Sequence, residues 1–239
     1  MKKVIKAFTL AVLMTGCTAQ QIQQAQKTLG GYLGEDKVST EEVVKGLKEA
    51  LVQGTGKGVA TVSQVNGYLG NAAIRIPFPP EVQKVEQKLR DLGFGKQVDQ
   101  FVETLNHGAE EAAKEAKPIF VNAITAMSIQ DAWNILKGAD DAATAYLISN
   151  TSTQLQASFK PVIQRALEKT SATKYYSDLI NTYNKIPFVE KVNPNLDDYA
   201  TQKAVDGLFV MIAKEEKNIR DNPGARATEL LKRVFSQQD

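Results

Sequence analysis

The stretch VDQFVETLNHGAEEAAKEAKPIFVNAITAM, residues 98–127, decides the fold class of this chain. Its apolar side chains return every three or four positions, which is the period of an α-helix with one buried face. They are Val98, Phe101, Leu105, Ala109, Ala112, Ala116, Phe120, Ala123 and Met127. The stretch therefore predicts helical structure along nearly its whole length.

The same period extends toward the N-terminus of this stretch. Apolar residues follow it in two further sets, which are Val44, Leu47, Leu51, Val62, Val65 and Leu69, and then Val82, Val85, Leu89 and Leu92. Only residues 74–80, IRIPFPP, alternate as a strand would, and their three prolines leave no strand to pair with. We predict an all-α bundle of about eight to ten helices, with one extended proline-rich connector lying on them.

Capping residues mark where several helices begin. Ser39 followed by Glu42 has the spacing of a capping box, and Val38 and Val43 hold the positions of a hydrophobic staple. Polar residues predict other starts at Ser128 with Asp131, Thr151 with Gln154, Asn222 before Pro223, Asp140 with Asp141, and Asp197 with Asp198. Capping accounts for these acid pairs without any catalytic role.

A weak internal repeat relates two segments that lie 43 residues apart. Lys117-Pro118-Ile119 with Ala123-Ile124 recurs as Lys160-Pro161-Val162 with Ala166-Leu167. This distance is the size of a helical-hairpin repeat. Duplication of one hairpin and chance similarity between two amphipathic helices both remain open.

The N-terminus has the form of a bacterial lipoprotein signal. Lys2, Lys3 and Lys6 precede a short apolar run over residues 8–14, and small residues then lead to Cys17. We expect residues 1–16 to be removed, Cys17 to be lipidated and acylated, for example by palmitate, and residues 17–38 to form a tether. Residues 39–239 then form a single helical domain. By the sorting convention, Thr18 in place of an aspartate indicates the outer membrane, facing the periplasm.

Composition excludes several classes of site. Removal of residues 1–16 takes away three lysines and turns the formal charge of +2 into −1, so there is no electrostatic case for nucleic acid. Cys17 is the sole cysteine, so the fold holds no internal disulfide. The expected partners are the membrane, reached through the lipid anchor, and an envelope protein.

The glycine-rich segment 54–58, GTGKG, lacks the Walker A spacing because Leu51 and Gly58 stand where glycine and a hydroxyl residue are required. Instead, Ala50, Gly54 and Gly58 recur every four residues and predict a helix face that another helix approaches closely.

His107 is the only histidine, with Glu103 and Glu111 one turn away on either side. This spacing could hold a metal ion, but one imidazole offers too few nitrogen ligands for a typical zinc site. The alternative is a solvated charged face with an i,i+4 pair, and this is our prediction. We expect no metal and no cofactor. No nucleophile elbow of the G-x-S-x-G type is present, so nothing supports an enzyme.

Glu215 is the charged residue with the most unusual position. It falls in the apolar stripe of Leu208, Met211, Ile212 and Ile219. An acid on a buried face must be paired, protonated or beside a cavity. We expect Glu215 to face inward, either in a structural ion pair or as a functional acid. The candidate partners are Arg75, which is the first choice, Arg220 and Arg226.

Four segments together resemble a bacterial family known as domain of unknown function 4197. They are AIRIPFPPEVQKVEQKLRDLG (73–93), KPIFVNAITAMSIQDAWNILKGADDAATAYL (117–147), LDDYATQKAVDGLF (196–209) and EEKNIRDNPGARATELLKRVF (215–235). The resemblance implies a secreted or lipid-anchored helical domain with no assigned activity, and no catalytic residues carry over. The positions that match the family pattern are Arg75, Asp141, Thr144, Asp206, Gly207, Glu215, Glu216, Arg220 and Arg226.

Two functions remain open at this stage. The first is a lipid-anchored module that binds a protein partner, or has a structural role, through its surface or a groove between helices. The second is a carrier of an apolar ligand, or an enzyme, with a pocket near Glu215 and Arg75. A groove of exposed apolar residues favours the first, and an enclosed pocket with converging Arg and Glu favours the second.

Overall fold

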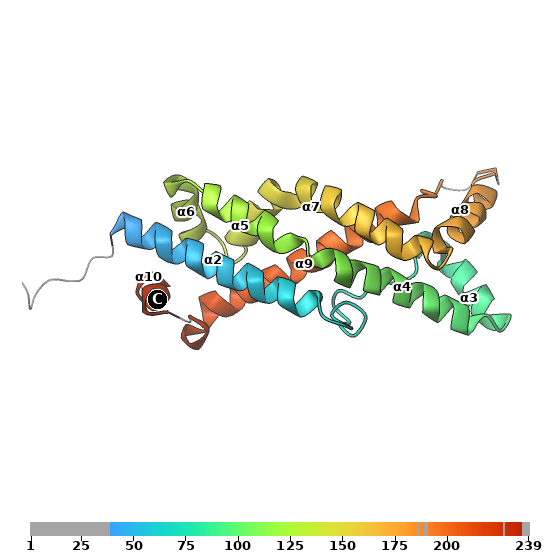
Figure 1. Cartoon of the computed structure of the whole chain (residues 1–239), viewed down its shortest axis with the longest axis horizontal. Helices are drawn as coiled ribbons and strands as arrows, with labels where there is room; N and C mark the ends of the chain where they lie inside the picture. Colours follow the sequence, from blue (N-terminus) through green and yellow to red (C-terminus); the bar gives the residue numbers. More distant parts are fainter. Residues whose placement is uncertain (1–38, 186, 189–190, 227, 236–239) are drawn as a thin grey trace, which may run out of the picture. The chain divides into compact units, whose positions relative to one another are not determined.

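A computed structural model describes residues 39–185, 187–188, 191–226 and 228–235 (Figure 1). These residues form nine α-helices and two short 3-10 helices, with no strand among them, which confirms the all-α prediction. The signal segment, Cys17, the tether and the staple residue Val38 lie outside the described residues.

The α-helices are α2 (Thr40–Val62), α3 (Gln83–Asp91), α4 (Gly95–Ala113), α5 (Ala116–Ala126), α6 (Ile129–Leu136), α7 (Ala142–Glu168), α8 (Ala172–Tyr183), α9 (Leu196–Asp221) and α10 (Glu229–Phe235). The 3-10 helices are η1 (Pro80–Val82) and η2 (Pro223–Ala225). Contacts group the described residues into one compact unit.

Helix α9 is the centre of this unit, since α2, α4 and α7 all pack against it (Figure 1). Its buried line advances in steps of four residues through Ala204, Leu208 and Ile212. Helices α5 and α10 pack on α2, and α5 also contacts α7. Apolar side chains of all these helices form the core.

The glycines of α2 let α9 come close. A Cβ at Gly58 would lie 3.3 Å from Cγ1 of Ile212, and one at Gly54 would lie 3.3 Å from Cδ1 of Ile219. Both distances are tighter than ordinary van der Waals contact. The prediction that the Gly54 and Gly58 face receives another helix is therefore confirmed.

Two predicted capping boxes are confirmed. The Ser39 Oγ accepts from the Glu42 amide at 3.2 Å, and the Glu42 carboxylate accepts from the Ser39 amide at 3.0 Å. Ser128 and Asp131 make the same reciprocal pair at the start of α6.

Two other predicted starts need correction. Thr151 lies in the middle of α7, where its buried hydroxyl donates to the carbonyl of Leu147 at 2.6 Å. Such a bond to the preceding turn is the alternative to capping for a threonine inside a helix. Asn222 does accept from the Gly224 amide, but it begins only η2, and α10 starts at Glu229.

The first apolar stripe ends earlier than predicted. Helix α2 stops at Val62, and the chain turns over residues 64–67, where Asn66 adopts a positive φ of 62°. Val65 is 80% exposed, and Tyr68 is the buried side chain of this turn. Similarly, no residue of α3 is fully buried, and Leu92 is exposed.

The proline-rich segment is the extended connector that the sequence predicted. Its alternate residues Ile74, Ile76 and Phe78 are buried, and Arg75 between them is exposed. The side chain of Asn106 on α4 makes the two backbone hydrogen bonds that a paired strand would otherwise make. Its Oδ1 accepts from the Ile76 amide at 2.8 Å, and its Nδ2 donates to the Ile76 carbonyl at 2.9 Å. Both backbone groups of the buried Ile76 are satisfied in this way without a sheet.

The two copies of the suspected repeat lie in different helical contexts. Lys117 and Pro118 are in the first turn of α5, whereas Lys160 and Pro161 lie well inside the 27-residue α7. The structure therefore adds no support for a duplicated hairpin.

Candidate functional site

The sequence expected Glu215 to pair with Arg75, and this pair is not formed. Glu215 lies on a partly exposed side of α9, where its Oε2 is 3.2 Å from Nζ of the exposed Lys57. Arg75 is exposed on the connector. The acid on the buried line of α9 is the next residue, Glu216, because that line advances by four from Ile212.

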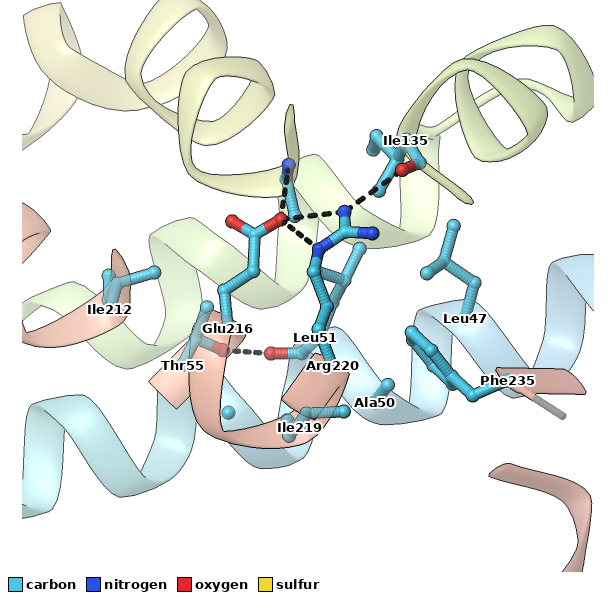
Figure 2. Close-up of a pocket in the computed structure, with 12 residues that line it drawn as sticks. Leu47, Ala50, Leu51, Thr55, Ile135, Ile212, Glu216, Ile219, Arg220 and Phe235 are labelled. Atoms are coloured by element: carbon cyan, nitrogen blue, oxygen red, sulfur yellow. Dashed lines mark hydrogen bonds and ion pairs between the residues drawn. The ribbon is translucent and has the colours of Figure 1, made fainter. Parts of the chain in front are cut away.

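Glu216 is the centre of a buried polar cluster (Figure 2). Its Oε1 accepts from the amide of Ala143 at 3.0 Å, and its Oε2 accepts from the amide and the hydroxyl of Thr144 at 2.7 and 2.8 Å. A carboxylate of α9 thus caps the start of α7, where Asp141 stands at the N-cap without a side-chain bond.

Arg220 completes this cluster. Its Nε and Nη2 donate to Oε1 of Glu216 at 3.0 and 2.8 Å, and Nη2 also donates to the carbonyl of Ile135 at 2.9 Å (Figure 2). Both side chains are less than a tenth exposed. The pair joins the end of α6, the start of α7 and the last turns of α9.

Arg226 lies at the C-terminal end of α9 and is buried. Its Nη2 donates to the carbonyl of Arg220 at 2.9 Å and its Nε to that of Ile219 at 3.3 Å. The guanidinium also lies 5.4 Å from the ring centre of Phe235. It thereby satisfies carbonyls that the end of α9 would otherwise leave open.

The cavity beside Glu216 is small. It has a volume of about 30 Å³, enough for about one water molecule, and apolar side chains such as Leu47 and Phe235 line most of it (Figure 2). Every oxygen of the carboxylate already has partners. This arrangement holds helices together, and the cavity beside Glu216 is too small for a substrate.

A second buried acid, Glu110, escaped the sequence analysis. Its Oε1 accepts from the amides of Tyr68 and Leu69, both at 3.1 Å, and its Oε2 lies 2.7 Å from Nδ1 of His107. One signal could have found it: Val102, Asn106 and Glu110 follow each other in steps of four along α4, and all three are buried.

The environment of His107 therefore differs from our prediction of a solvated charged helix face. Its side chain is 48% exposed, but its ring is held by the buried Glu110. Glu103 and Glu111 are both exposed, and Glu111 pairs with Lys114.

A much larger cavity than the one beside Glu216 is a cleft between α3, α4 and α8, with a volume of about 950 Å³. The apolar part of its lining is Phe78, Leu89, Phe94, Val98, Phe101 and Tyr176, and the polar part is Gln97, Gln100, Glu103, Thr104, His107 and Thr170. We call this the α3–α4–α8 cleft.

The aromatic residues of the α3–α4–α8 cleft differ in their packing and in how much of their surface is exposed. Phe78 of the connector packs on Phe101, with ring centres 4.7 Å apart. Burial raises the pKa of the Tyr176 phenol to about 12, with a smaller contribution from Glu81, so this group stays neutral at physiological pH. Phe94, at the turn between α3 and α4, is 48% exposed although it lines the cleft, and the adjacent Leu92 is 73% exposed.

Two further searches cover the described residues. None of their helices is both long and apolar enough to cross a membrane. No three of their His, Cys, Asp or Glu side chains gather closely enough to hold a metal ion.

Four of the nine positions that matched the family pattern lie together in the structure. Thr144, Glu216, Arg220 and Arg226 meet at the buried polar cluster or beside it. Gly207 lies under the ring of Tyr68, Asp141 stands at the N-cap of α7, and Asp206 is exposed and accepts a bond from Gln202. These positions mainly maintain the fold.

Comparison with known proteins shows what the chain is related to. No curated protein matches it, and no solved structure matches it. Residues 37–236 match a family described as protein of unknown function (DUF4197), which covers nearly the whole described unit. The chain therefore belongs to the DUF4197 family of proteins of unknown function.

Proposed function

We propose that this protein is a lipid-anchored binding module of the bacterial cell envelope that binds a protein partner through the α3–α4–α8 cleft. The anchor rests on the N-terminal sequence, in which a basic start and a short apolar run lead to Cys17. The binding site rests on the cleft and its exposed apolar edge.

The exposed edge of the cleft is the observation that carries the proposal. Phe94 lines the cleft together with Leu89, Val98 and Phe101 and keeps about half of its surface in water, and Leu92, two residues earlier in the chain, is also exposed. Exposed apolar side chains at the mouth of a cleft are typical of interaction sites. A groove lined by both apolar side chains and polar side chains along α4 suits an amphipathic segment of another protein.

The position of the cleft fits this role. The chain enters the described unit at Ser39, and α2 then runs for 23 residues, about 34 Å at 1.5 Å per residue. Figure 1 shows the start of α2 with α6 and α10 at one end of the bundle, and α3 and α8 at the other end. Within this unit, the helices that line the cleft therefore lie toward the end opposite the start of α2.

Site-specific photo-crosslinking in living cells tests the binding site. We would place p-benzoylphenylalanine at Gln97 or Thr104 in the cleft, and at Val52 or Ile148 as controls, which are exposed apolar positions outside it. We expect one protein adduct from both cleft positions, lost on the change Phe94→Glu and absent from both controls. Equal adducts at all four positions, or none from the cleft, would contradict the proposal.

The anchor has its own test. Cys17→Ser should abolish labelling by a clickable palmitate analogue and block removal of residues 1–16. Labelling that persists in Cys17→Ser would show that the anchor lies elsewhere or is absent.

The volume of the cleft favours a second candidate, a carrier of an apolar small molecule. About 950 Å³ lies within the usual range of ligand sites. Native mass spectrometry of the processed chain purified from its own envelope separates the two. A bound molecule of constant mass, displaced by Phe94→Glu, would favour the carrier, whereas an unliganded chain that still gives the cleft-specific protein adduct would favour the binding module.

A further inference from the structure

Glu110 determines how His107 faces the α3–α4–α8 cleft. His107 lines the cleft, and its Nδ1 lies 2.7 Å from Oε2 of Glu110, whose side chain is only 6% exposed. Nδ1 is thus engaged on the side of the protein interior. Nε2 is the ring nitrogen left for the cleft, and within the described residues no group bonds to it.

The carboxylate of Glu110 fixes which nitrogen carries the proton. Its Oε1 accepts from two backbone amides, those of Tyr68 and Leu69, and such bonds stabilise its negative charge. An ionised carboxylate only accepts hydrogen bonds, so Nδ1 must be the donor. In the neutral ring, Nε2 then presents a lone pair to the cleft.

Among the described residues that line the cleft, the only ionised side chain besides the His107 ring is acidic. This is Glu103, one turn before His107, and no Lys or Arg is among these described residues. Arg90 of the neighbouring α3 is already paired with Glu86 and Asp99. On α8, Tyr176 contributes a neutral phenol.

We infer that the His107 end of the cleft takes a hydrogen-bond donor from the partner, in the form of a Lys or Arg side chain. The apolar residues of the same partner segment occupy the walls around Phe94 and Phe101. Charge complementarity identifies this occupant, since a cation meets Glu103 and the lone pair of Nε2 together. The inference rests on the proposed protein-binding function of the cleft.

The tautomer can be measured directly because His107 is the only histidine of the chain. In a chain that begins at residue 18, after the lipidated Cys17, and carries no histidine tag, two-bond ¹H–¹⁵N correlation spectra assign the ring proton. We expect the Nδ1–H form in the wild type. The Nε2–H form in the wild type would overturn the inference.

Glu110→Gln is the matched variant. Its carbonyl can still accept from Tyr68 and Leu69, but its amide donates to Nδ1, so the proton should move to Nε2. A spectrum that stays in the Nδ1–H form would contradict the role we assign to Glu110. If this variant does not fold, the wild-type spectrum alone decides which ring nitrogen of His107 carries the proton.

Peptide selection tests the occupant. Random 12-residue peptides displayed on phage are selected on the processed chain, and those that also bind Phe94→Glu are removed. We expect the remaining peptides to pair apolar residues with a Lys or Arg. Changing that Lys to norleucine should weaken binding about tenfold on the wild type, the loss expected for a charge-assisted hydrogen bond, and less than about twofold on Glu110→Gln or His107→Phe.

The outcomes separate the two proposals. Peptides that depend on Phe94 but show no preference for Lys or Arg, or that lose the same affinity on all variants, overturn the inference and leave the binding cleft in place. If no selected peptide depends on Phe94, the proposed function fails, and the inference fails with it.

Discussion

The ring of Tyr68 lies directly against the backbone of α9 at Gly207. A Cβ at position 207 would be 2.7 Å from Cε1 of Tyr68 and 3.1 Å from Cβ of Ile74. The Tyr68 hydroxyl donates to the carbonyl of Ala204 at 2.6 Å, and burial raises the pKa of this phenol well above its usual value. This contact holds the turn after α2, and the connector that follows it, against α9.

Gly207→Ala should therefore destabilise the protein by about 2 kcal/mol, the usual cost of forcing an extra carbon into a packed interior. Gly56→Ala is the control, because a Cβ there meets nothing within 4 Å. That change should raise the free energy of unfolding by up to about 1 kcal/mol through helix propensity. Urea unfolding measures both values. Equal effects of the two changes would mean that Tyr68 does not pack as described.

Glu216→Ala should cost about 3–5 kcal/mol, because Arg220 would remain buried without its carboxylate and the start of α7 would lose its cap. Glu215→Ala removes the adjacent acid, whose partner Lys57 is mostly exposed, and should change stability by less than about 1 kcal/mol. Chemical denaturation of this pair of variants decides which acid is structural. A larger loss for Glu215→Ala would reverse the assignment.

Asn106→Leu should destabilise by about 3 kcal/mol, because the buried amide and carbonyl of Ile76 both lose their partner. Asn106→Asp keeps an acceptor for the amide but cannot donate to the carbonyl, so it should also be destabilising. Hydrogen exchange gives a local readout: the Ile76 amide should lose protection in Asn106→Leu. Unchanged protection of that amide would show that the connector is held in another way.

The two capping boxes should make the free energy of unfolding decrease at low pH. Hydrogen bonds from the Ser39 amide and hydroxyl lower the pKa of Glu42, and bonds from Ser128 lower that of Asp131. Because these pKa values are depressed in the folded state, the stability they contribute is fully present above the ordinary values of 4.5 and 3.8 and is lost as the pH falls through the folded-state values.

Glu42→Gln combined with Asp131→Asn tests this dependence. The double variant should be less stable than the wild type at pH 7, and the two should converge as the pH falls below 4. Urea midpoints measured from pH 7 to pH 2.5 give the comparison. Parallel curves over this range would show that these carboxylates do not contribute through their charge.

Short-range features of the sequence determined much of this fold. The helical period of residues 98–127, the boxes at Ser39 and Ser128, and the small face at Gly54 and Gly58 all involve residues within one or two turns of each other, and the structure contains each of them. Caps and periodicity are local because they depend only on a residue and its near neighbours. The membership of the family could likewise be anticipated from the sequence segments alone.

Only the tertiary structure decided which side chains meet. Adjacent helix residues point about 100° apart, so the way α9 is rotated about its own axis when it docks decides whether Glu215 or Glu216 is the buried acid. The pairing of Glu216 with the start of α7, of Glu110 with the Tyr68 turn, and of Asn106 with Ile76 joins residues at least 30 positions apart. No local pattern encodes such pairs, because they depend on how whole helices dock. The α3–α4–α8 cleft has the same origin: its walls come from four separate segments that become neighbours only when the bundle is formed.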